Sequence, residues 1–405
     1  MGQSAICAAA SAPAGPIVSV PVSDACCDLL ELFAGVADGR VGQGRDHPVA
    51  AVLALAAAAV VAGMKGYTAI TGWVADVPPA ILADLYLRSG AAPAPPPSKT
   101  TIWRVLTGAD TEAFDVAVGT WLMDLAGFPT PATTGEEDCS RALMQVRLDG
   151  KAVRGAKDAG GNQVRLLAAL VGPDAAASVI AAQTEVGKKT NEVPMAAVVL
   201  GQIDLEGKIV TADALHTVRA TADHIHDHGG EFVLPVKENR QALFDVLDAL
   251  PWDQVPVAHT ATDKGHGRIT TRTIQVLPAP EDLPFPHVSQ VFLIERHVTD
   301  LAGKPVSDVA ALGVASPGPG QADPAALAGY VREQWSIESL HWVRDTLWQE
   351  DKSQVRTRNG PRIMAALRNL AIGALRLAGR PDITEATRWA GRSMDRPFTI
   401  LGLTS

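Results

Sequence analysis

The sequence KIVTADALHTVRATADHIHDHGGEFVLPVKENR, residues 208–240, predicts a strand, a helix and a second strand in direct succession. The first strand is a short β-branched run that ends on Asp213, so this carboxylate lies where a buried strand stops. Residues 214–228 have apolar side chains at helical spacing, and residues 231–236 form the second strand, which leads to Lys237. In open α/β sheets the strand ends form the crevice in which chemistry takes place. Asp213 is therefore the first candidate for an active-site residue.

Three further strands are predicted upstream of this stretch. Residues 145–150 alternate between polar and apolar side chains and reach Asp149, and two more strand-like runs follow at 163–172 and 178–186. Residues 191–201 then form a helix that crosses over to the strand ending at Asp213. The predicted order is β, β, β, α, β, α, β, with an acid at the first and at the fourth strand. This order is typical of the ribonuclease-H-like fold, in which those two strands lie side by side.

The remaining segments surround this α/β core. Residues 24–127 show helical apolar spacing, and such a block could bind DNA, bind a partner or brace the next domain. After residue 250 the pattern becomes irregular, with alternating runs that predict strands, and helical spacing returns at Pro324. We predict an α/β fold with a ribonuclease-H-like catalytic domain, a β-rich insertion and a preceding all-helical domain. The predicted segments are a disordered leader (1–23), the helical domain (24–127), the first part of the catalytic domain (140–250), the insertion (251–322), the C-terminal part of the catalytic domain (323–380) and a basic tail (381–405).

The charge distribution leaves room for a nucleic-acid partner. The formal net charge of −9 disfavours one, but residues 351–396 contain ten Lys and Arg against four Asp and Glu. Arginine dominates this excess, and arginine suits phosphate contacts better than mere solubility requires. Arg356, Arg358 and Arg362 are therefore candidates for DNA contact. A solvated helix face is the alternative interpretation.

The cysteine and hydropathy patterns indicate the compartment. The four cysteines have no metal-ligand spacing and do not suggest a disulfide framework. The first 21 residues are rich in Ala, Ser and Pro and lack the basic start of a secretory signal. The apolar run 49–63 is shorter than the ~20 residues that cross a bilayer, so it predicts a buried helix. We expect a cytoplasmic protein without a membrane partner.

Two carboxylates on neighbouring strand ends predict a metal site. Asp149 and Asp213 cannot both stay ionised at low cost unless a cation lies between them. Carboxylate ligands select hard ions such as Mg²⁺ or Mn²⁺, and two ions roughly 4 Å apart could clamp the oxygens of a phosphoryl transfer. Glu338, on a predicted helix, is the candidate for the third acid. Asp213 could instead be a helix cap, because it directly precedes a helix.

Six separated motifs then carry a resemblance to a known family. In chain order they are DGK followed by Arg154 and Gly155, KTNEV (189–193), TADALH (211–216), GGEFVLPVKENR (229–240), HGRITTR (266–272), and QWSIESLHW with QED (334–342 and 349–351). Together they resemble the insertion-sequence transposases of the DDE type, in the subgroup of H-repeat-associated proteins. The segment GRDHPVAAVLALAAAAVVAGMKGYTAI resembles the amino-terminal helical domain associated with that subgroup. The resemblance covers about residues 38–376.

The resemblance implies DNA transposition, in which element ends are cleaved with the help of a metal and the freed 3′-hydroxyl attacks target DNA. Asp149, Asp213 and Glu338 would be the catalytic acids and the ligands of probably two Mg²⁺ or Mn²⁺ ions. Double-stranded DNA, as terminal inverted repeats and as target, would be the partner of a homodimer associated with the bacterial nucleoid. The DNA-binding residues would be Lys151, Arg154, Lys237, His341, Arg356, Arg358 and Arg362, of which Lys151, Lys237 and His341 would hold phosphates or orient the helix.

The third acid departs from the pattern of related cut-and-paste transposases. Those proteins have Y-x-x-R-x-x-x-E-x-x-x-x-x-x-K, whereas this chain has Val331, Gln334 and Asp345 at the three flanking places. Tyr330 and Arg332 are close but out of register. Glu350 and Asp351 also compete with Glu338, but they lie where the helix ends, and we expect them to be solvated.

Two other features have simpler explanations than a binding role. The histidines at 216, 224, 226 and 228 could suggest zinc, but alternate spacing on a helix points them to different faces, which favours solvated side chains. Trp335, Trp342 and Trp348 could stack on extruded bases. Packing in the core around Glu338 is the interpretation that we favour for them.

Three hypotheses about function remain open on the sequence. The first is an active transposase. The second is a nuclease of the same fold that hydrolyses DNA without strand transfer, and the third is an inactive DNA-binding remnant. The presence of all three acids argues against the third.

Overall fold

A computed structural model describes residues 27–40, 42, 45–128, 143–157, 163–187, 192–265 and 267–404 of the chain. The predicted leader, residues 1–23, lies outside these ranges, as do the first residues of the predicted catalytic domain. Within the described ranges, no helix is both long enough and apolar enough to cross a membrane.

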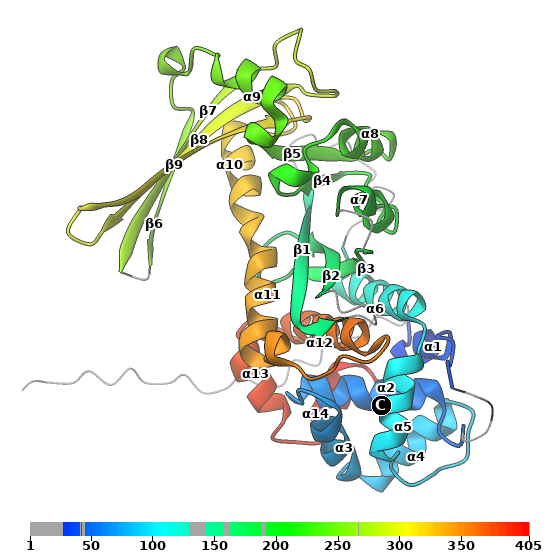
Figure 1. Cartoon of the computed structure of the whole chain (residues 1–405). Coiled ribbons are helices and arrows are strands. Elements are labelled where there is room, and N and C mark those ends of the chain that lie inside the picture. The colour runs from blue at the N-terminus through cyan, green and yellow to red at the C-terminus, as the bar shows by residue number, and fades with distance from the viewer. Residues whose placement is uncertain are drawn as a thin grey trace, which may run out of the picture.

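The chain forms a helical part at one end and a large sheet at the other, and one long helical rod runs between them (Figure 1). The rod consists of α10 (Pro324–Glu333) and α11 (Trp335–Leu347). Its neighbours at the helical end come from both termini of the chain. The other helices are α1 (Leu29–Ala34), α2 (Val49–Val61), α3 (Tyr67–Ala75), α4 (Pro79–Arg88), α5 (Lys99–Gly108), α6 (Thr111–Ala126), α7 (Glu192–Leu200), α8 (Arg219–Asp227), α9 (Gln241–Asp248), α12 (Gly360–Leu377), α13 (Ile383–Ala390) and α14 (Asp395–Ile400).

Nine strands form one sheet in the order β3-β2-β1-β4-β5-β9-β8-β7-β6. β4 is parallel to β1 and β5 is parallel to β4, whereas the other neighbours are antiparallel. The strands are β1 (Met144–Lys157), β2 (Gln163–Gly172), β3 (Val179–Glu185), β4 (Lys208–Thr211), β5 (Glu231–Val236), β6 (His259–Gly265), β7 (Arg268–Pro278), β8 (Gln290–Asp300) and β9 (Pro305–Ala315).

The predicted contact between the first and the fourth strand is confirmed. β1 pairs with β4 from Met144 opposite Lys208 to Arg147 opposite Thr211. The sequence pattern explains this pairing, since a meander of three strands is followed by helical crossovers, which return the chain parallel to its first strand. The apolar face of β1, with Val146 and Leu148, packs in a core with α7 and α8.

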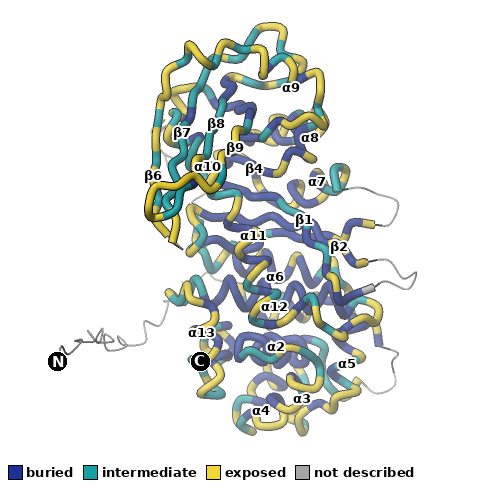
Figure 2. Tube along the Cα trace, turned by 60° about the vertical axis from the view of Figure 1, so that its left-hand side comes forward, coloured by how far each residue is buried: buried dark blue, intermediate teal, exposed yellow. Residues whose placement is uncertain are grey.

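The segment 251–322 does contain the predicted strands, and they extend the same sheet. β9 pairs with β5, and β8, β7 and β6 follow outward as a long antiparallel arm that projects from the body. The outer strands of this arm are mostly exposed or half-buried, whereas the centre of the sheet is buried (Figure 2).

The C-terminal segment is not the basic tail that we predicted. Residues 383–390 and 395–400 form α13 and α14, and Phe398, Leu401 and Leu403 are fully buried in the core of the helical part. α12, which lies within the predicted C-terminal part of the catalytic domain, packs in the same core against α2, α5 and α6. Because α12 packs in this core, some of its arginine side chains are buried.

The centre of the helical part is α2, whose Ala- and Val-rich sequence is buried on all sides. This confirms the predicted buried helix, because a helix that is apolar all round must be covered all round. α6 connects the helical part to the sheet by packing on β3. At Gly119 the approach is so close that an added Cβ would collide with the carbonyl oxygen of Ala181, so only glycine fits there.

The predicted helix 214–228 is interrupted after its first turn. Residues 214–216 form a 3₁₀ turn, Val218 is extended, and α8 begins at Arg219. Thr217 causes the break in part, since its hydroxyl donates a hydrogen bond to the carbonyl oxygen of Pro235 at 2.6 Å. The interruption leaves His216 buried beside Asp213 instead of on a solvated helix.

Candidate active site

One face of β1 is polar, and the helical rod covers it. Alternate side chains of a strand share a face, and here four of them contact residues of α10 or α11 in chain order. Six residues of strand span roughly 20 Å and fifteen residues of helix span roughly 22 Å, so the two rows match in length. We call this row of contacts the polar seam. Its contacts are Gln145 Nε2 to the Tyr330 carbonyl oxygen (2.8 Å), Arg147 Nη2 to Glu333 Oε2 (3.9 Å), Asp149 Oδ2 to His341 Nδ1 (3.3 Å) and Lys151 Nζ to Asp345 Oδ2 (2.6 Å).

Asp149 and Asp213 occupy equivalent places on adjacent parallel strands. Each lies two residues beyond the pair Arg147 and Thr211, the last that β1 and β4 form. Because neighbouring strands are ~4.8 Å apart, equal steps along parallel strands keep the two backbones side by side. One oxygen of Asp213 accepts a hydrogen bond from the Leu215 amide at 2.8 Å. Asp213 is therefore the N-cap of the 3₁₀ turn 214–216, as the alternative interpretation proposed. This hydrogen bond uses one carboxylate oxygen and does not involve the second.

The polar seam positions Glu338 beside Asp149. Gln334, one turn before Glu338, donates to the carbonyl oxygen of Leu148 at 3.0 Å, and His341, one turn after it, contacts Asp149. Burial and the charge of Asp149 raise the pKa of Glu338. Asp149 therefore lies close enough to Glu338 to disfavour the ionised form of the Glu338 carboxyl group.

A fourth acid, which the sequence analysis missed, lies next to the backbone of Gly150. Glu192 begins α7, and burial together with the charges of Asp149 and Asp213 raises the pKa of its carboxyl group. The sequence did contain a signal for Glu192, since it is the acid of the KTNEV motif. It was missed because Glu192 does not follow a predicted strand, as Asp149 and Asp213 do.

The acidic side chains are suitable ligands for a hard divalent cation, but they do not form a complete coordination shell by themselves. Within the described part of the chain, no three His, Cys, Asp or Glu side chains converge closely enough to hold a metal ion. The donors around Asp149 and Asp213 are carboxylates, which suit Mg²⁺ or Mn²⁺, and these ions complete their shells with water and substrate phosphate. A cation would also offset the repulsion that raises the pKa of Glu338 and Glu192.

His341 contacts Asp149 and Lys151 contacts Asp345, so both of these predicted DNA-binding side chains are engaged within the protein. Both side chains are buried. Burial lowers the pKa of His341 although Asp149 opposes the shift, and its Nε2 has no hydrogen-bond partner among the described residues. Lys151 Nζ lies 2.6 Å from a carboxylate oxygen of Asp345, the residue at the place where the transposase pattern has lysine.

The predicted DNA-binding residues divide into accessible and internal ones. Arg154, Lys237, Arg356 and Arg358 are exposed, and Arg356 donates to the carbonyl oxygen of Gly155 at 2.9 Å, close to Arg154. The prediction for Arg362 is wrong, because its guanidinium is buried and lies 2.6 Å from the carboxylate of Asp115.

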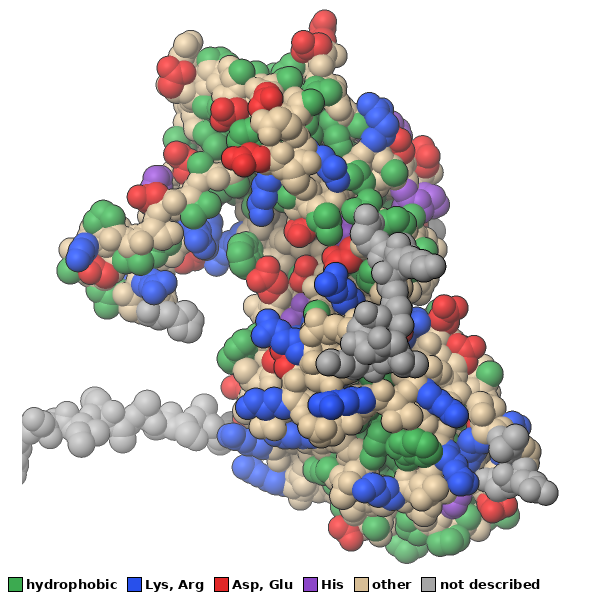
Figure 3. Space-filling model, in the orientation of Figure 1, with side chains coloured by type: hydrophobic (Ala, Val, Ile, Leu, Met, Phe, Trp, Pro, Cys, Tyr) green, Lys and Arg blue, Asp and Glu red, His purple; other side chains and the backbone are tan. Residues whose placement is uncertain are grey.

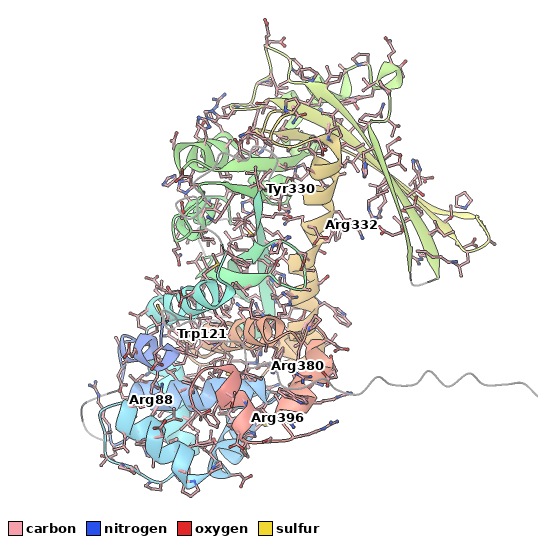
Figure 4. The ribbon with its side chains drawn as sticks, turned by 180° about the vertical axis from the view of Figure 1, so that it is seen from behind. Arg88, Trp121, Tyr330, Arg332, Arg380 and Arg396 are labelled. Carbon is pink, nitrogen blue, oxygen red and sulfur yellow. The ribbon has the colours of Figure 1, made fainter. Side chains whose placement is uncertain are left out.

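A row of Lys and Arg side chains is visible across the lower half of the molecule in Figure 3. Two arginines of the C-terminal segment have a structural role there. The guanidinium groups of Arg380 and Arg396 lie 3.6 Å and 4.4 Å from the ring centre of Trp389, and both arginines project from the helical part in Figure 4.

The tryptophans of α11 contradict the interpretation that we favoured. Trp335 and Trp342 are 60% and 66% exposed, on the same face as Glu338, and only Trp348 is buried. The core therefore does not explain the two indoles beside Glu338.

Glu350 is not solvated, contrary to our expectation. It is fully buried and accepts hydrogen bonds from Arg344 at 2.9–3.2 Å and from Arg368 at 2.6 Å, while Lys151 Nζ lies 4.0 Å away. Tyr330 and Arg332 do not reach the acids either. The Tyr330 hydroxyl contacts the Leu143 carbonyl oxygen, and Arg332 contacts Asp263 on β6, toward the arm that Figure 4 shows beside it.

Comparison with known proteins agrees with this geometry. Residues 143–373 match the family described as "Transposase DDE domain", and residues 30–122 match the domain described as "DDE_Tnp_1-associated". The chain is 31% identical over 248 residues to an "Uncharacterized protein in dhlA 3'region" of Xanthobacter autotrophicus. That alignment covers 58% of this chain and 76% of the relative. It is 22% identical over 365 residues to the "H repeat-associated putative transposase YhhI" of Escherichia coli (strain K12), covering 86% and 90% of the two chains. A piggyBac transposase in a synaptic complex with hairpin DNA aligns over 92% of this chain with a TM-score of 0.43 and 10% identity, which is too little to define the fold.

The fold, the row of acids and the matched regions define a member of the DDE transposase-domain family. Within that family the chain belongs to the H repeat-associated subgroup, together with the associated amino-terminal helical domain.

Proposed function

We propose that this protein is a DNA transposase that cleaves the ends of an insertion sequence and joins them to target DNA by metal-dependent phosphoryl transfer. The observation that carries the proposal is the placement of Asp149 and Asp213 at equivalent positions of two parallel strands, with Glu338 held beside Asp149 by the polar seam. We also propose that the strands β1 to β5 and their helices are a ribonuclease-H-like catalytic unit, which their order supports.

Each residue of the site has a role in this proposal. Asp149, Asp213 and Glu338 would hold Mg²⁺ or Mn²⁺, which when bound activates the attacking oxygen and neutralises charge on the phosphate. His341 keeps the Asp149 carboxylate in place, and Lys151 fixes the register of the rod through Asp345. The polar seam would thereby keep the catalytic acids aligned while DNA binds.

Double-stranded DNA is the proposed partner, as element ends and as target, bound by a homodimer. Arg154, Lys237, Arg356 and Arg358 are the exposed cations that would contact its phosphates. An assay with the inverted repeats that flank the gene tests the function. A transposase cleaves the ends and joins them to a second DNA; a nuclease of the same fold only cleaves, and an inactive remnant only binds. Either of the last two results would overturn the proposal.

Metal removal should abolish the reaction. Because the ligands are carboxylates, we expect cleavage with Mg²⁺ or Mn²⁺ and none after chelation, whereas Ca²⁺ should support DNA binding without turnover. Cleavage of a labelled end fragment, measured across the metals, checks this. Full activity in excess chelator would contradict the metal mechanism.

The exposed arginines before α12 should contribute to the salt dependence of DNA binding. Replacing Arg356 and Arg358 by Gln should weaken binding to any DNA and reduce the slope of log K against log salt by about two, since each lost phosphate contact removes about one. Fluorescence anisotropy at several salt concentrations measures the slope. Arg104→Gln, an exposed arginine on α5, is the matched control. An unchanged slope in the double variant would mean that this face is only solvated.

A further inference from the structure

A cavity opens beside the candidate active site, at the edge of the sheet where β4 and β5 end. It has a volume of about 450 Å³ and lies between α8, α9 and the loop that precedes β8. Because β4 and β5 are parallel, Asp213 and Lys237, which follow these strands, lie at the same edge. Thr217, in the segment after Asp213, and Asn239, just after Lys237, both line the cavity.

The polar part of the cavity wall is positively charged. Arg219 and Arg240 line it, and no acidic side chain is among the described residues that line it. Arg240 Nε donates a hydrogen bond to the carbonyl oxygen of Thr217 at 2.7 Å, and Arg240 Nη2 donates to that of Leu215 at 3.4 Å. These contacts fix the guanidinium at the wall, and neutral carbonyl groups do not cancel its charge. The wall therefore suits an anion.

Two helices begin at this cavity without a side-chain cap. α8 begins at Arg219 after Val218, α9 begins at Gln241 after Arg240, and neither preceding side chain accepts a hydrogen bond from the first turn. In contrast, Asp or Ser side chains cap α1, α5, α6, α10 and α13. The first amide groups of α8 and α9 can therefore donate to an anion, in addition to the two arginines.

The rest of the cavity wall is apolar. It consists largely of Leu243 and Phe285, which are buried, and Pro284, which is exposed. The ring of Phe285 packs edge-on against Phe232, with the ring centres 6.1 Å apart. A wall that is cationic on one side and apolar on the other fits a ligand with an anionic and a less polar part. The phosphate and the deoxyribose of a DNA strand have these properties, and both are common protein contacts.

We infer that this cavity binds the phosphate and sugar of one nucleotide in the DNA strand that reaches the catalytic acids. The phosphate contacts Arg219 and Arg240, and the deoxyribose lies against the wall with Phe285. The inference rests on the proposed function, because it takes DNA as the substrate at Asp213. A DNA strand is favoured over a free nucleotide by the location, since the cavity shares the sheet edge with Asp213 and Lys237.

The first test fills the cavity without removing a charge. Ala242 and Ala220 are exposed residues in the first turns of α9 and α8, but only Ala242 lines the cavity. Ala242→Trp should weaken the binding of an element-end duplex about tenfold, which corresponds to ~1.4 kcal/mol. Ala220→Trp is the matched control and should bind as the unmodified chain does. Fluorescence anisotropy measures the affinity, and circular dichroism shows that both variants are folded.

The second test removes a charge and leaves the cavity open. Arg219→Gln should reduce the slope of log K against log salt by about one, because one phosphate contact is lost. Adding Arg219→Gln to Ala242→Trp should cause almost no further loss of affinity, since both changes remove the same contact. Full additivity of the two changes would contradict the inference.

Thymidine 3′,5′-bisphosphate, followed by phosphorus NMR, separates a DNA strand from other occupants. If Ala242→Trp loses the bisphosphate but binds DNA normally, the cavity holds a free nucleotide and the assignment to DNA is wrong. If Ala242→Trp binds both ligands like the unmodified chain, the cavity holds only solvent, which also overturns the inference. If Ala242→Trp binds DNA more weakly but the unmodified chain neither cleaves nor joins element ends, the proposed function fails and the nucleotide site stands.

Discussion

Glu338→Gln should reduce cleavage of element ends by at least about 10³-fold while DNA binding stays within about twofold. The amide has the shape of the carboxylate but not its charge, so it cannot share a divalent cation with Asp149. Glu338 is exposed, and the substitution should leave the packing of α11 unchanged. Single-turnover cleavage and a binding isotherm on the same DNA measure the two effects separately.

The remaining acids and a neighbour on the same rod supply the comparison. Asp149→Asn and Asp213→Asn should behave like Glu338→Gln, whereas Glu333→Gln, five residues earlier and bound to Arg147 across 3.9 Å, should cleave at nearly the normal rate. Normal cleavage by Glu338→Gln would mean that a different acid completes the site and that our assignment of α11 is wrong.

The strand order and the positions of the two aspartates were predictable because they depend on local patterns. A meander followed by helical crossovers leaves few ways to arrange five strands. Asp213 follows from that arrangement, since it ends a β-branched run. Asp149 was expected at a strand end as well, but β1 continues to Lys157, so Asp149 lies within the strand. The prediction needed no knowledge of contacts between distant segments.

The polar seam could not be predicted, because its two halves are almost 200 residues apart. Polar and apolar residues alternate along β1, and such alternation normally indicates one solvated face. In the structure the polar face is covered by α10 and α11, whose side chains meet Gln145, Arg147, Asp149 and Lys151. The alternation along β1 therefore reflects a buried polar interface, and this becomes visible only when α10 and α11 are seen packed against the strand.

The outward and inward faces of α11 were assigned wrongly for a related reason. Apolar Trp335 and Trp342 were expected inside and lie outside, whereas charged Glu350, just after the helix, was expected to be solvated and lies inside. Residues seven apart on a helix share a face, so the two indoles follow Glu338 to the surface. Charged residues enter a core when they pair, and the partners here come from different elements.

The buried ion cluster formed by Glu350, Arg344 and Arg368 leads to the second large effect. Glu350→Gln should lower the free energy of unfolding by about 3–5 kcal/mol, because it leaves two buried guanidinium groups without their shared anion. Burial by itself would raise the pKa of Glu350, but the charges of Arg344 and Arg368 outweigh it and lower the pKa to about 2. Urea unfolding between pH 7 and pH 3, followed by circular dichroism, measures both the loss and its pH dependence.

The sign of the pH dependence distinguishes this cluster from a catalytic acid. A carboxyl group whose pKa is lower in the folded chain stabilises it above the ordinary value of 4.5, and the stabilisation is lost as the pH falls toward 2. The unmodified chain should therefore lose stability below about pH 5, and the difference from Glu350→Gln should shrink in the same range. Asp351→Asn, the neighbouring acid whose side chain is 27% exposed, should cost less than about 1 kcal/mol at any pH. A Glu350→Gln variant that unfolds like the unmodified chain but does not cleave DNA would instead make Glu350 the third acid, because a group that contributes nothing to stability and everything to cleavage must act on the substrate or its metal.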